Sequence, residues 1–159
     1  MLKAIIATDD ERWRILVRLL VGLIVFFPEG IQKLAFPALL GAGRFTRIGI
    51  FWPEVMGPFV GVVEIACGAL IVFGLLTRLA AVPLIVTMLV AIVSTKLPIL
   101  VGHDIGPFML GDARRLGFWA MAHEARTDFC MLLGCTYLLF VGAGGWSLDR
   151  RWLKRMQRL

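Results

Sequence analysis

Long apolar stretches alternate with short polar segments along the chain, and this pattern predicts helices over residues 15–35, 55–76, 79–97 and 127–141. The first stretch holds about 20 residues, which rise about 30 Å as a helix and match the hydrocarbon core of a bilayer. Only Thr77 and Arg78 separate the second stretch from the third, so these two helices should form an antiparallel hairpin. The pattern therefore predicts an all-α fold: an integral membrane four-helix bundle that forms a single transmembrane domain over residues 1–159.

Most polar residues lie outside these helices, in residues 1–14, in a long loop over 98–126 and in a basic tail over 146–159. Loops of this length are usually functional or contain a short helix. In the long loop, His103 precedes Asp104 and His123 precedes Glu124, pairings that also occur in metal sites and proton relays. Two scattered pairs are more typical of solvated loop side chains, so we predict no metal site.

The composition supports a membrane location. Hydrophobic residues make up 59% of the chain and the mean hydropathy is +0.85, which is more apolar surface than one small soluble core can bury. Lys and Arg total 17 against 11 Asp and Glu. Because the basic excess lies mostly at the termini, it suits anionic lipid headgroups better than nucleic acid. With four spans, ten of the 17 basic residues lie on the side of the termini, so the positive-inside rule predicts that both termini are cytoplasmic.

Ionisable residues inside the predicted helices are the candidates for a functional site. Glu29 and Lys33 are four residues apart on the first helix, which allows either a local ion pair or a polar pocket that opens outward. Glu64 lies near the middle of the second helix, where an ionisable group is costly and indicates function. It shares a helix face with glycines that permit close helix approach, Gly57, Gly61 and Gly68, so it should point into the bundle.

Depth along the helices sets which of these groups can meet. Lys33 is near the outer end of its helix and Glu64 is more than two turns down the next, so a direct bridge between them would need a long reach or a displaced register. Glu29 is closer in depth to Glu64, and Asp128, at the outer start of the fourth helix, is level with Lys33. We therefore predict a ligand-binding site in the outer half of the bundle, formed by Glu64, Glu29, Lys33 and Asp128. The alternative for Glu64 is a structural role in fixing helix packing.

Four segments carry a resemblance to a known family: residues 29–34 (EGIQKL), 64–70 (EIACGAL), 74–81 (GLLTRLAA) and 142–149 (GAGGWSLD). On these the chain resembles the DoxX family of small four-helix membrane proteins over nearly its whole length, although its long loop departs from compact members. The resemblance implies a multi-pass protein of a bacterial or archaeal cytoplasmic (inner) membrane. Some relatives are associated with quinone-linked oxidation of sulfur compounds or with oxidative-stress complexes.

The resemblance and the site together favour a non-autonomous membrane subunit of a redox system, in contact with the lipid bilayer and with other membrane or redox subunits. In this hypothesis the polar pocket receives a quinone or another lipid-like ligand, Glu64 hydrogen-bonds it or relays its proton, and Lys33 supplies positive charge. The sequence contains no autonomous catalytic motif, so enzymatic activity of the chain alone stays open. A scaffold or assembly factor is the alternative. A small transporter is less favoured, because four helices without an inverted repeat leave little room for alternating access.

Overall fold

The computed structural model describes residues 5–8 and 10–157, and its regular elements there are helices, with one isolated β-bridge between Ile105 and Phe108. In chain order the helices are α2 (Arg14–Ile24), η1 (Val25–Ile31), α3 (Gln32–Ala35), α4 (Ala42–Arg47), α5 (Pro53–Phe73), α6 (Thr77–Ala91), η2 (Ile92–Lys96), α7 (Leu97–Val101), α8 (Phe118–Val141) and α9 (Leu148–Met156). The segments η1 and η2 are π-helical and continue α2 into α3 and α6 into α7. The all-α prediction is thus confirmed for the described residues.

Three helices are long and apolar enough to cross a membrane: Arg14–Ala35, Pro53–Phe73 and Thr77–Val101, with 22, 21 and 25 residues. They correspond to the first three predicted helices. The first of these helices includes η1, where the helical turn widens around Pro28, which cannot donate an amide hydrogen.

The fourth predicted helix differs from its prediction. α8 has 24 residues and begins at Phe118, nine residues before the predicted start at 127, so the loop over 98–126 shrinks to residues 102–117. The added residues 118–126 read FWAMAHEAR and are rich in strong helix formers, which outweigh the polar side chains among them. Because those polar side chains lie in its first half, α8 is not among the three apolar membrane-length helices of the described chain.

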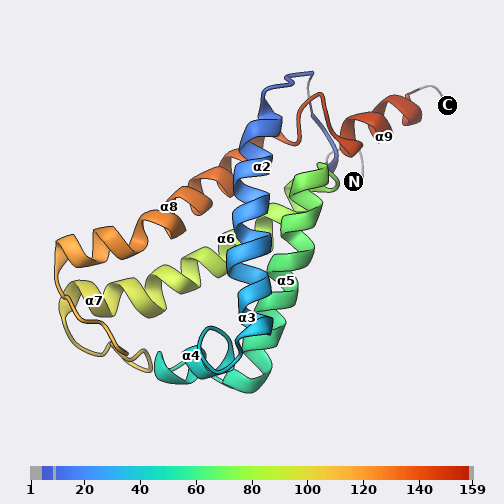
Figure 1. Ribbon diagram of the computed structural model, residues 1–159. Helices are drawn as coiled ribbons and strands as arrows, with labels where there is room; N and C mark the ends of the chain where they lie inside the picture. Colours follow the sequence, from blue (N-terminus) through green and yellow to red (C-terminus); the bar gives the residue numbers. More distant parts are fainter. Residues whose placement is uncertain (1–4, 9, 158–159) are drawn as a thin grey trace.

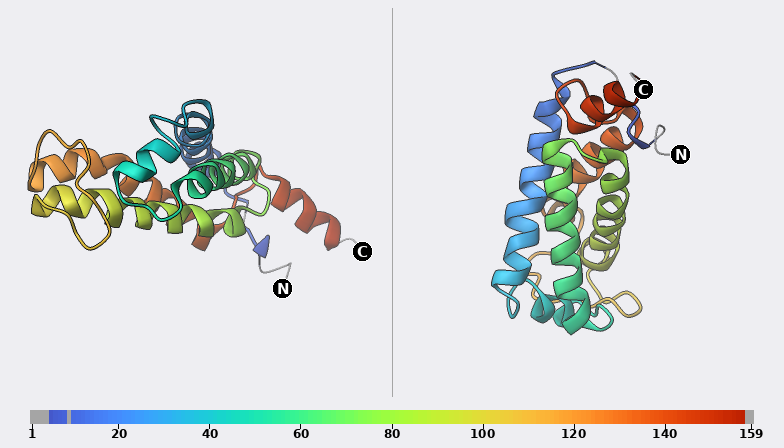
Figure 2. Two further views of the ribbon diagram at one scale, coloured as in Figure 1. Left: turned by 90° about the horizontal axis from the view of Figure 1, so that it is seen from below. Right: turned by 90° about the vertical axis from the view of Figure 1, so that its right-hand side faces the viewer.

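The helices pack as two pairs that meet at one end and diverge at the other (Figure 1). α2, η1 and α3 run beside α5, while α6, η2 and α7 run beside α8. We call the closed end, with the start of α2, the α5–α6 turn and α9, the terminal end. At the other end, which we call the cavity end, α4 and residues 102–117 lie between the diverging pairs (Figure 2). The hydrophobic core lies towards the terminal end, where it is formed by Val21, Val25, Ile71, Leu84 and Leu138 with their neighbours.

Glycines set the close contact between the first two long helices. A Cβ at Gly68 would lie 3.0 Å from both the carbonyl oxygen of Gly22 and the amide nitrogen of Phe26, so the backbones of α2 and α5 touch there. A Cβ at Gly30 would lie 3.0 Å from the amide nitrogen of Ile65. The predicted inward face of α5 is confirmed, because its buried residues include Gly57, Gly61, Glu64 and Gly68.

Hydrogen bonds from α9 and the residues before it close the terminal end. The buried carboxylate of Asp149 accepts hydrogen bonds from the backbone amides of Leu76, at 2.7 Å, and Thr77, at 3.0 Å. These amides belong to the start of α6, which has no partner for them within the helix. Arg18, which is 1% exposed, donates from Nη2 to the carbonyl oxygen of Trp146 at 2.6 Å. Two segments that resemble the DoxX pattern, 74–81 and 142–149, therefore hold each other in place.

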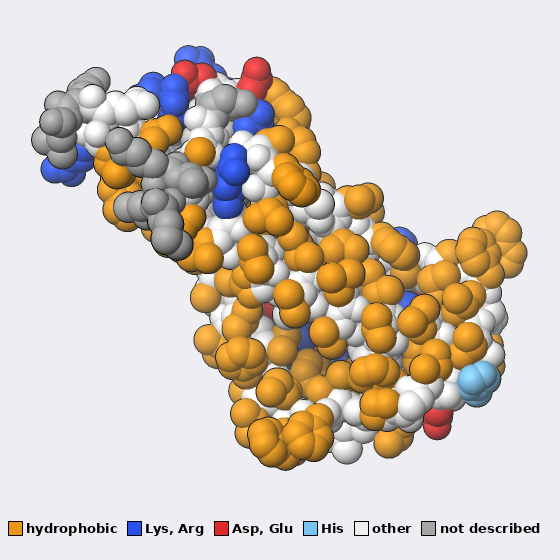
Figure 3. Space-filling model, turned by 180° about the vertical axis from the view of Figure 1, so that it is seen from behind, with side chains coloured by type: hydrophobic (Ala, Val, Ile, Leu, Met, Phe, Trp, Pro, Cys, Tyr) orange, Lys and Arg blue, Asp and Glu red, His pale blue; other side chains and the backbone are white. Residues whose placement is uncertain are grey.

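The face of the molecule opposite to that of Figure 1 is mostly apolar between its two ends. On the face opposite to that of Figure 1, hydrophobic side chains cover most of the length of the molecule, while charged side chains gather at the terminal end (Figure 3). Large exposed residues include Leu16, Phe59, Phe73, Leu133 and Phe140. Such a surface is unfavourable in water and indicates contact with the lipid bilayer.

Candidate functional site

Lys33 joins the two acidic residues predicted for the site. Its ammonium Nζ lies 2.7 Å from Glu64 Oε2 and 3.2 Å from Glu29 Oε2. The Glu64 side chain is 3% exposed and the Lys33 side chain 12%, so their ion pair is largely removed from the surface. The prediction that Lys33 and Glu64 are separated in depth is therefore wrong.

The packing of the first helix explains this contact. Gly30 lies directly against Glu64 and Ile65, so the two helices are level at that point, and Lys33 follows within one turn. Helical side chains tilt towards the N-terminus, which brings the Lys33 stem back to the level of Gly30. α5 also extends beyond the end of α3, where Gly57 packs against α4. The depth estimate fails because it assumes that the two helices end at the same level.

A second ion pair joins the other two helices. Lys96, the last residue of η2, places its Nζ 3.2 Å from Asp128 Oδ2 of α8, with side chains 7% and 20% exposed. The predicted position of Asp128 at the outer start of its helix is wrong: it lies ten residues into α8, because the helix begins at Phe118. Sequence analysis missed Lys96 altogether. The sequence does indicate this residue, since a lysine inside an apolar stretch is as costly to bury as Glu64.

The four predicted residues line one small cavity. Glu29, Lys33, Glu64 and Asp128 surround a volume of about 270 Å³ together with Lys96, and we call this space the ion-pair chamber. Most of its remaining wall is apolar and includes Phe45, Ile50, Met56, Phe59, Val60, Val86, Met88 and Val90. The arrangement can donate hydrogen bonds from two ammonium groups and accept them at three carboxylates, inside walls that suit a hydrophobic ligand.

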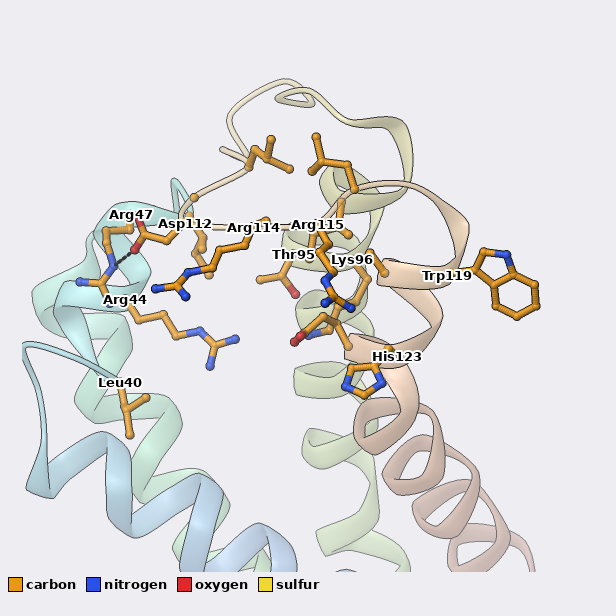
Figure 4. Close-up of a pocket in the computed structure, with 18 of the residues that line it drawn as sticks. Leu40, Arg44, Arg47, Thr95, Lys96, Asp112, Arg114, Arg115, Trp119 and His123 are labelled. Atoms are coloured by element: carbon orange, nitrogen blue, oxygen red, sulfur yellow. Dashed lines mark ion pairs between the residues drawn. The ribbon is translucent and has the colours of Figure 1, made fainter.

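A wider cavity of about 1080 Å³ adjoins the chamber at the cavity end, and we call it the basic cavity (Figure 4). It shares Arg44, Ile48, Thr95 and Lys96 with the chamber, so the two spaces are contiguous. Further lining comes from α4, α8 and residues 110–116 of the connection before α8. Sequence analysis did not single out this cavity, because its residues come from loops and helix ends far apart in the chain.

The two histidine pairs stay apart in the structure. His123 lines the basic cavity, and its ring nitrogens lie within 2.7 Å of Arg126 Nη1. His103 is exposed and contacts the carbonyl oxygen of Asp104. Across residues 5–8 and 10–157, no three His, Cys, Asp or Glu side chains lie close enough together to hold a metal ion.

Membrane-length apolar helices that enclose buried ion pairs define this chain as a helical multi-pass membrane protein. The family model DoxX matches residues 14–97, and the chain belongs to the DoxX family. It is 55% identical over 141 residues to "Uncharacterized membrane protein Rv3486" of Mycobacterium tuberculosis (strain ATCC 25618 / H37Rv), covering 89% of this chain and 82% of that protein.

A more distant relative carries a functional name. The chain is 29% identical over 136 residues to "Putative oxidoreductase CatD" of Bacillus subtilis (strain 168), covering 85% of this chain and 83% of that protein. No solved structure is significantly similar to the chain. The family model covers Glu29, Lys33, Glu64 and Lys96 but ends before Asp128.

Proposed function

We propose that this protein is a membrane subunit of a quinone-linked redox system and that the ion-pair chamber binds a quinone or a similar lipid-like ligand. The observation that carries the proposal is the pairing of Lys33 with Glu64 and of Lys96 with Asp128 on the wall of a largely apolar cavity. Membership of the DoxX family and the name of the Bacillus subtilis relative support a redox role.

The chamber residues suit a ring that carries carbonyl groups. A quinone, when bound, accepts and returns electrons together with protons. The Lys33 ammonium donates a hydrogen bond to a ligand carbonyl, and Glu64 accepts a hydrogen bond or passes on a proton. The apolar wall, with Phe59 and Met88 among its residues, holds the hydrocarbon part of the ligand.

The proposed membrane arrangement has four crossings in the inner membrane. Three are the apolar helices, and the fourth is α8, which packs along α6 over its second half. Both termini are then on the cytoplasmic side by the distribution of Lys and Arg, and the cavity end faces outward. A quinone dissolved in the bilayer would enter the chamber between the diverging helix pairs, and partner subunits would supply or take its electrons.

Titration of the purified protein in detergent with a short-chain ubiquinone and a short-chain menaquinone tests the proposal. Calorimetry should give measurable affinity for one of them, and Glu64→Gln should weaken it about tenfold, the effect of losing one hydrogen bond to a charged group. The matched control is Glu54→Gln, the same change in the exposed first turn of α5, with unchanged affinity. Equal affinity of the wild type and Glu64→Gln would contradict the role of Glu64, and no binding of either quinone would contradict the proposal.

A scaffold or assembly factor is the second candidate, and one observation favours it. Each ion pair joins neighbouring helices, Lys33 and Glu64 linking α3 to α5 and Lys96 and Asp128 linking η2 to α8, as packing contacts would. Variants of the first ion pair distinguish the scaffold function from quinone binding. If Glu64→Gln and Lys33→Met lower the melting temperature in detergent while growth phenotypes stay intact, the scaffold function is favoured.

A further inference from the structure

The basic cavity carries more positive than negative charge. Its lining includes five basic side chains, Arg44, Arg47, Lys96, Arg114 and Arg115, against the two acidic side chains Asp112 and Glu124. Lys96 is paired with Asp128, and Arg47 Nε lies 3.4 Å from Asp112 Oδ2. Within the described part of the chain, no carboxylate forms an ion pair with Arg44, Arg114 or Arg115. Three guanidinium groups of this cavity therefore lack a counter-ion.

These three guanidinium groups reach into one space from different elements. Arg44 extends from α4, and Arg114 points towards the same region from the connection before α8 (Figure 4). Arg115 reaches from that connection towards Thr95 and Lys96 on the far side of the cavity. Like charges that share a cavity repel each other, so an anion held between them would stabilise this arrangement. The planar guanidinium fork matches the oxygen atoms of phosphates and carboxylates in two-point hydrogen bonds.

The presence of three guanidinium groups favours a phosphate over a carboxylate as the bound anion. A carboxylate has two oxygen atoms, which one guanidinium fork can satisfy, whereas a phosphate group offers three or four oxygen atoms that can bind several guanidinium groups at once. We infer that the basic cavity binds a phosphate-type oxyanion, held by Arg44, Arg114 and Arg115. The cavity is also lined by apolar residues, Leu39, Leu40, Ile99 and Leu116, which could contact the acyl chains of a phospholipid. The bound phosphate is therefore either a phospholipid headgroup or free phosphate. This site adjoins the proposed quinone site and shares Arg44 with it, whereas Arg114 and Arg115 line the basic cavity and not the ion-pair chamber.

Two binding measurements on the purified full chain in detergent test this inference. Native mass spectrometry measures retention of phosphatidylglycerol against diacylglycerol with the same chains, which lacks the phosphate. Calorimetry measures binding of inorganic phosphate. The test variant is Arg114→Gln/Arg115→Gln, and the control is Arg151→Gln/Arg155→Gln in α9, which removes the same charge from exposed positions at the terminal end. Both variants should melt as the wild type does, because all four side chains are exposed.

We expect the test variant to lose affinity about tenfold for at least one phosphate probe, and the control to stay within about twofold. Loss for phosphatidylglycerol alone identifies a lipid headgroup, and loss for inorganic phosphate identifies a soluble anion. Arg44→Gln, which changes the opposite wall, should reproduce the loss. The inference is overturned if inorganic phosphate does not bind the wild type and phosphatidylglycerol binds no more tightly than diacylglycerol, or if test and control variants lose affinity equally. None of these outcomes depends on quinone binding.

Discussion

The two ends of the molecule use the same residue types in opposite ways. At the terminal end, Arg18 and Asp149 are 1% exposed and bind backbone groups, so their polar atoms serve to connect segments. At the cavity end, Arg44, Arg114 and Arg115 surround an open volume and bind no carboxylate of the described chain. A buried charged group that binds backbone atoms connects segments of the fold, whereas a charged group that faces a cavity is available to a ligand. The ion-pair chamber combines both arrangements, because its charged groups form ion pairs within the fold and also line a cavity.

The largest expected effect is the loss of Asp149. Asp149→Ala leaves the amides of Leu76 and Thr77 without their acceptor and removes the charge that offsets buried Arg18. We expect the free energy of unfolding in detergent to fall by about 4 kcal/mol. Asp112→Ala at the cavity end is the control, with a change within about 0.5 kcal/mol, since that side chain is 87% exposed. An equal loss of unfolding free energy in Asp149→Ala and Asp112→Ala would contradict the proposed difference between the terminal end and the cavity end.

Breaking the second ion pair should have the next largest effect. Lys96→Met leaves Asp128 partly buried without a partner, and we expect a loss of about 3 kcal/mol in thermal or denaturant unfolding. The double variant Lys96→Met/Asp128→Leu removes both charges and should recover most of that loss. If the double variant is no more stable than Lys96→Met, an unpaired Asp128 is not the cause of the loss.

Helix contact at Gly68 should have a smaller effect. Gly68→Val drives a side chain into the backbone at Gly22 and Phe26, and we expect a loss of about 2 kcal/mol from overpacking. Ala66→Val on the exposed face of α5 is the matched control and should change stability by less than about 0.5 kcal/mol. Unfolding of both variants in the same detergent provides the comparison, and a tolerated valine at position 68 would contradict the close contact between α2 and α5.

The smallest effect concerns an exposed ion pair at the terminal end. Arg150 donates two hydrogen bonds to the carboxylate of Asp10, and this contact lowers the pKa of Asp10 below its ordinary value. A depressed folded-state pKa gives stability that is complete above the unfolded-state pKa and is lost as the pH falls through the folded-state value. The wild type should therefore lose slightly more stability than Asp10→Asn in melting scans below about pH 4. Parallel pH profiles of the two proteins would contradict this contribution.

Local periodicity and hydropathy correctly predict several features that belong to single helices. The inward face of α5, with Glu64 among glycines, follows from the 3.6-residue repeat, and hydropathy identifies the three apolar membrane-length helices. It also selects Glu29, Lys33, Glu64 and Asp128, which the fold brings to one cavity.

Contacts between elements could not be predicted in the same way. The axial shift that joins Lys33 to Glu64 depends on how Gly30 packs against α5, which no single segment encodes. The long α8 was missed because His123 and Glu124 resemble loop residues, although strong helix formers surround them. Arg44 of α4 and Arg114 of the connection before α8 line one cavity only because of how these two segments are placed, so the cavity has no local sequence pattern.

The hydrogen bonds of Asp149 have a consequence for the order of assembly during synthesis. The amides of Leu76 and Thr77 are made 72 or more residues before their acceptor, and Arg18 precedes the carbonyl of Trp146 by 128 residues. The hairpin of α5 and α6 is thus complete before Asp149 is made. Until then the amides of Leu76 and Thr77 in its turn lack their hydrogen-bond acceptor. Ribosome-bound chains stopped before residue 149 should expose this turn to protease, and release of the completed chain should protect it.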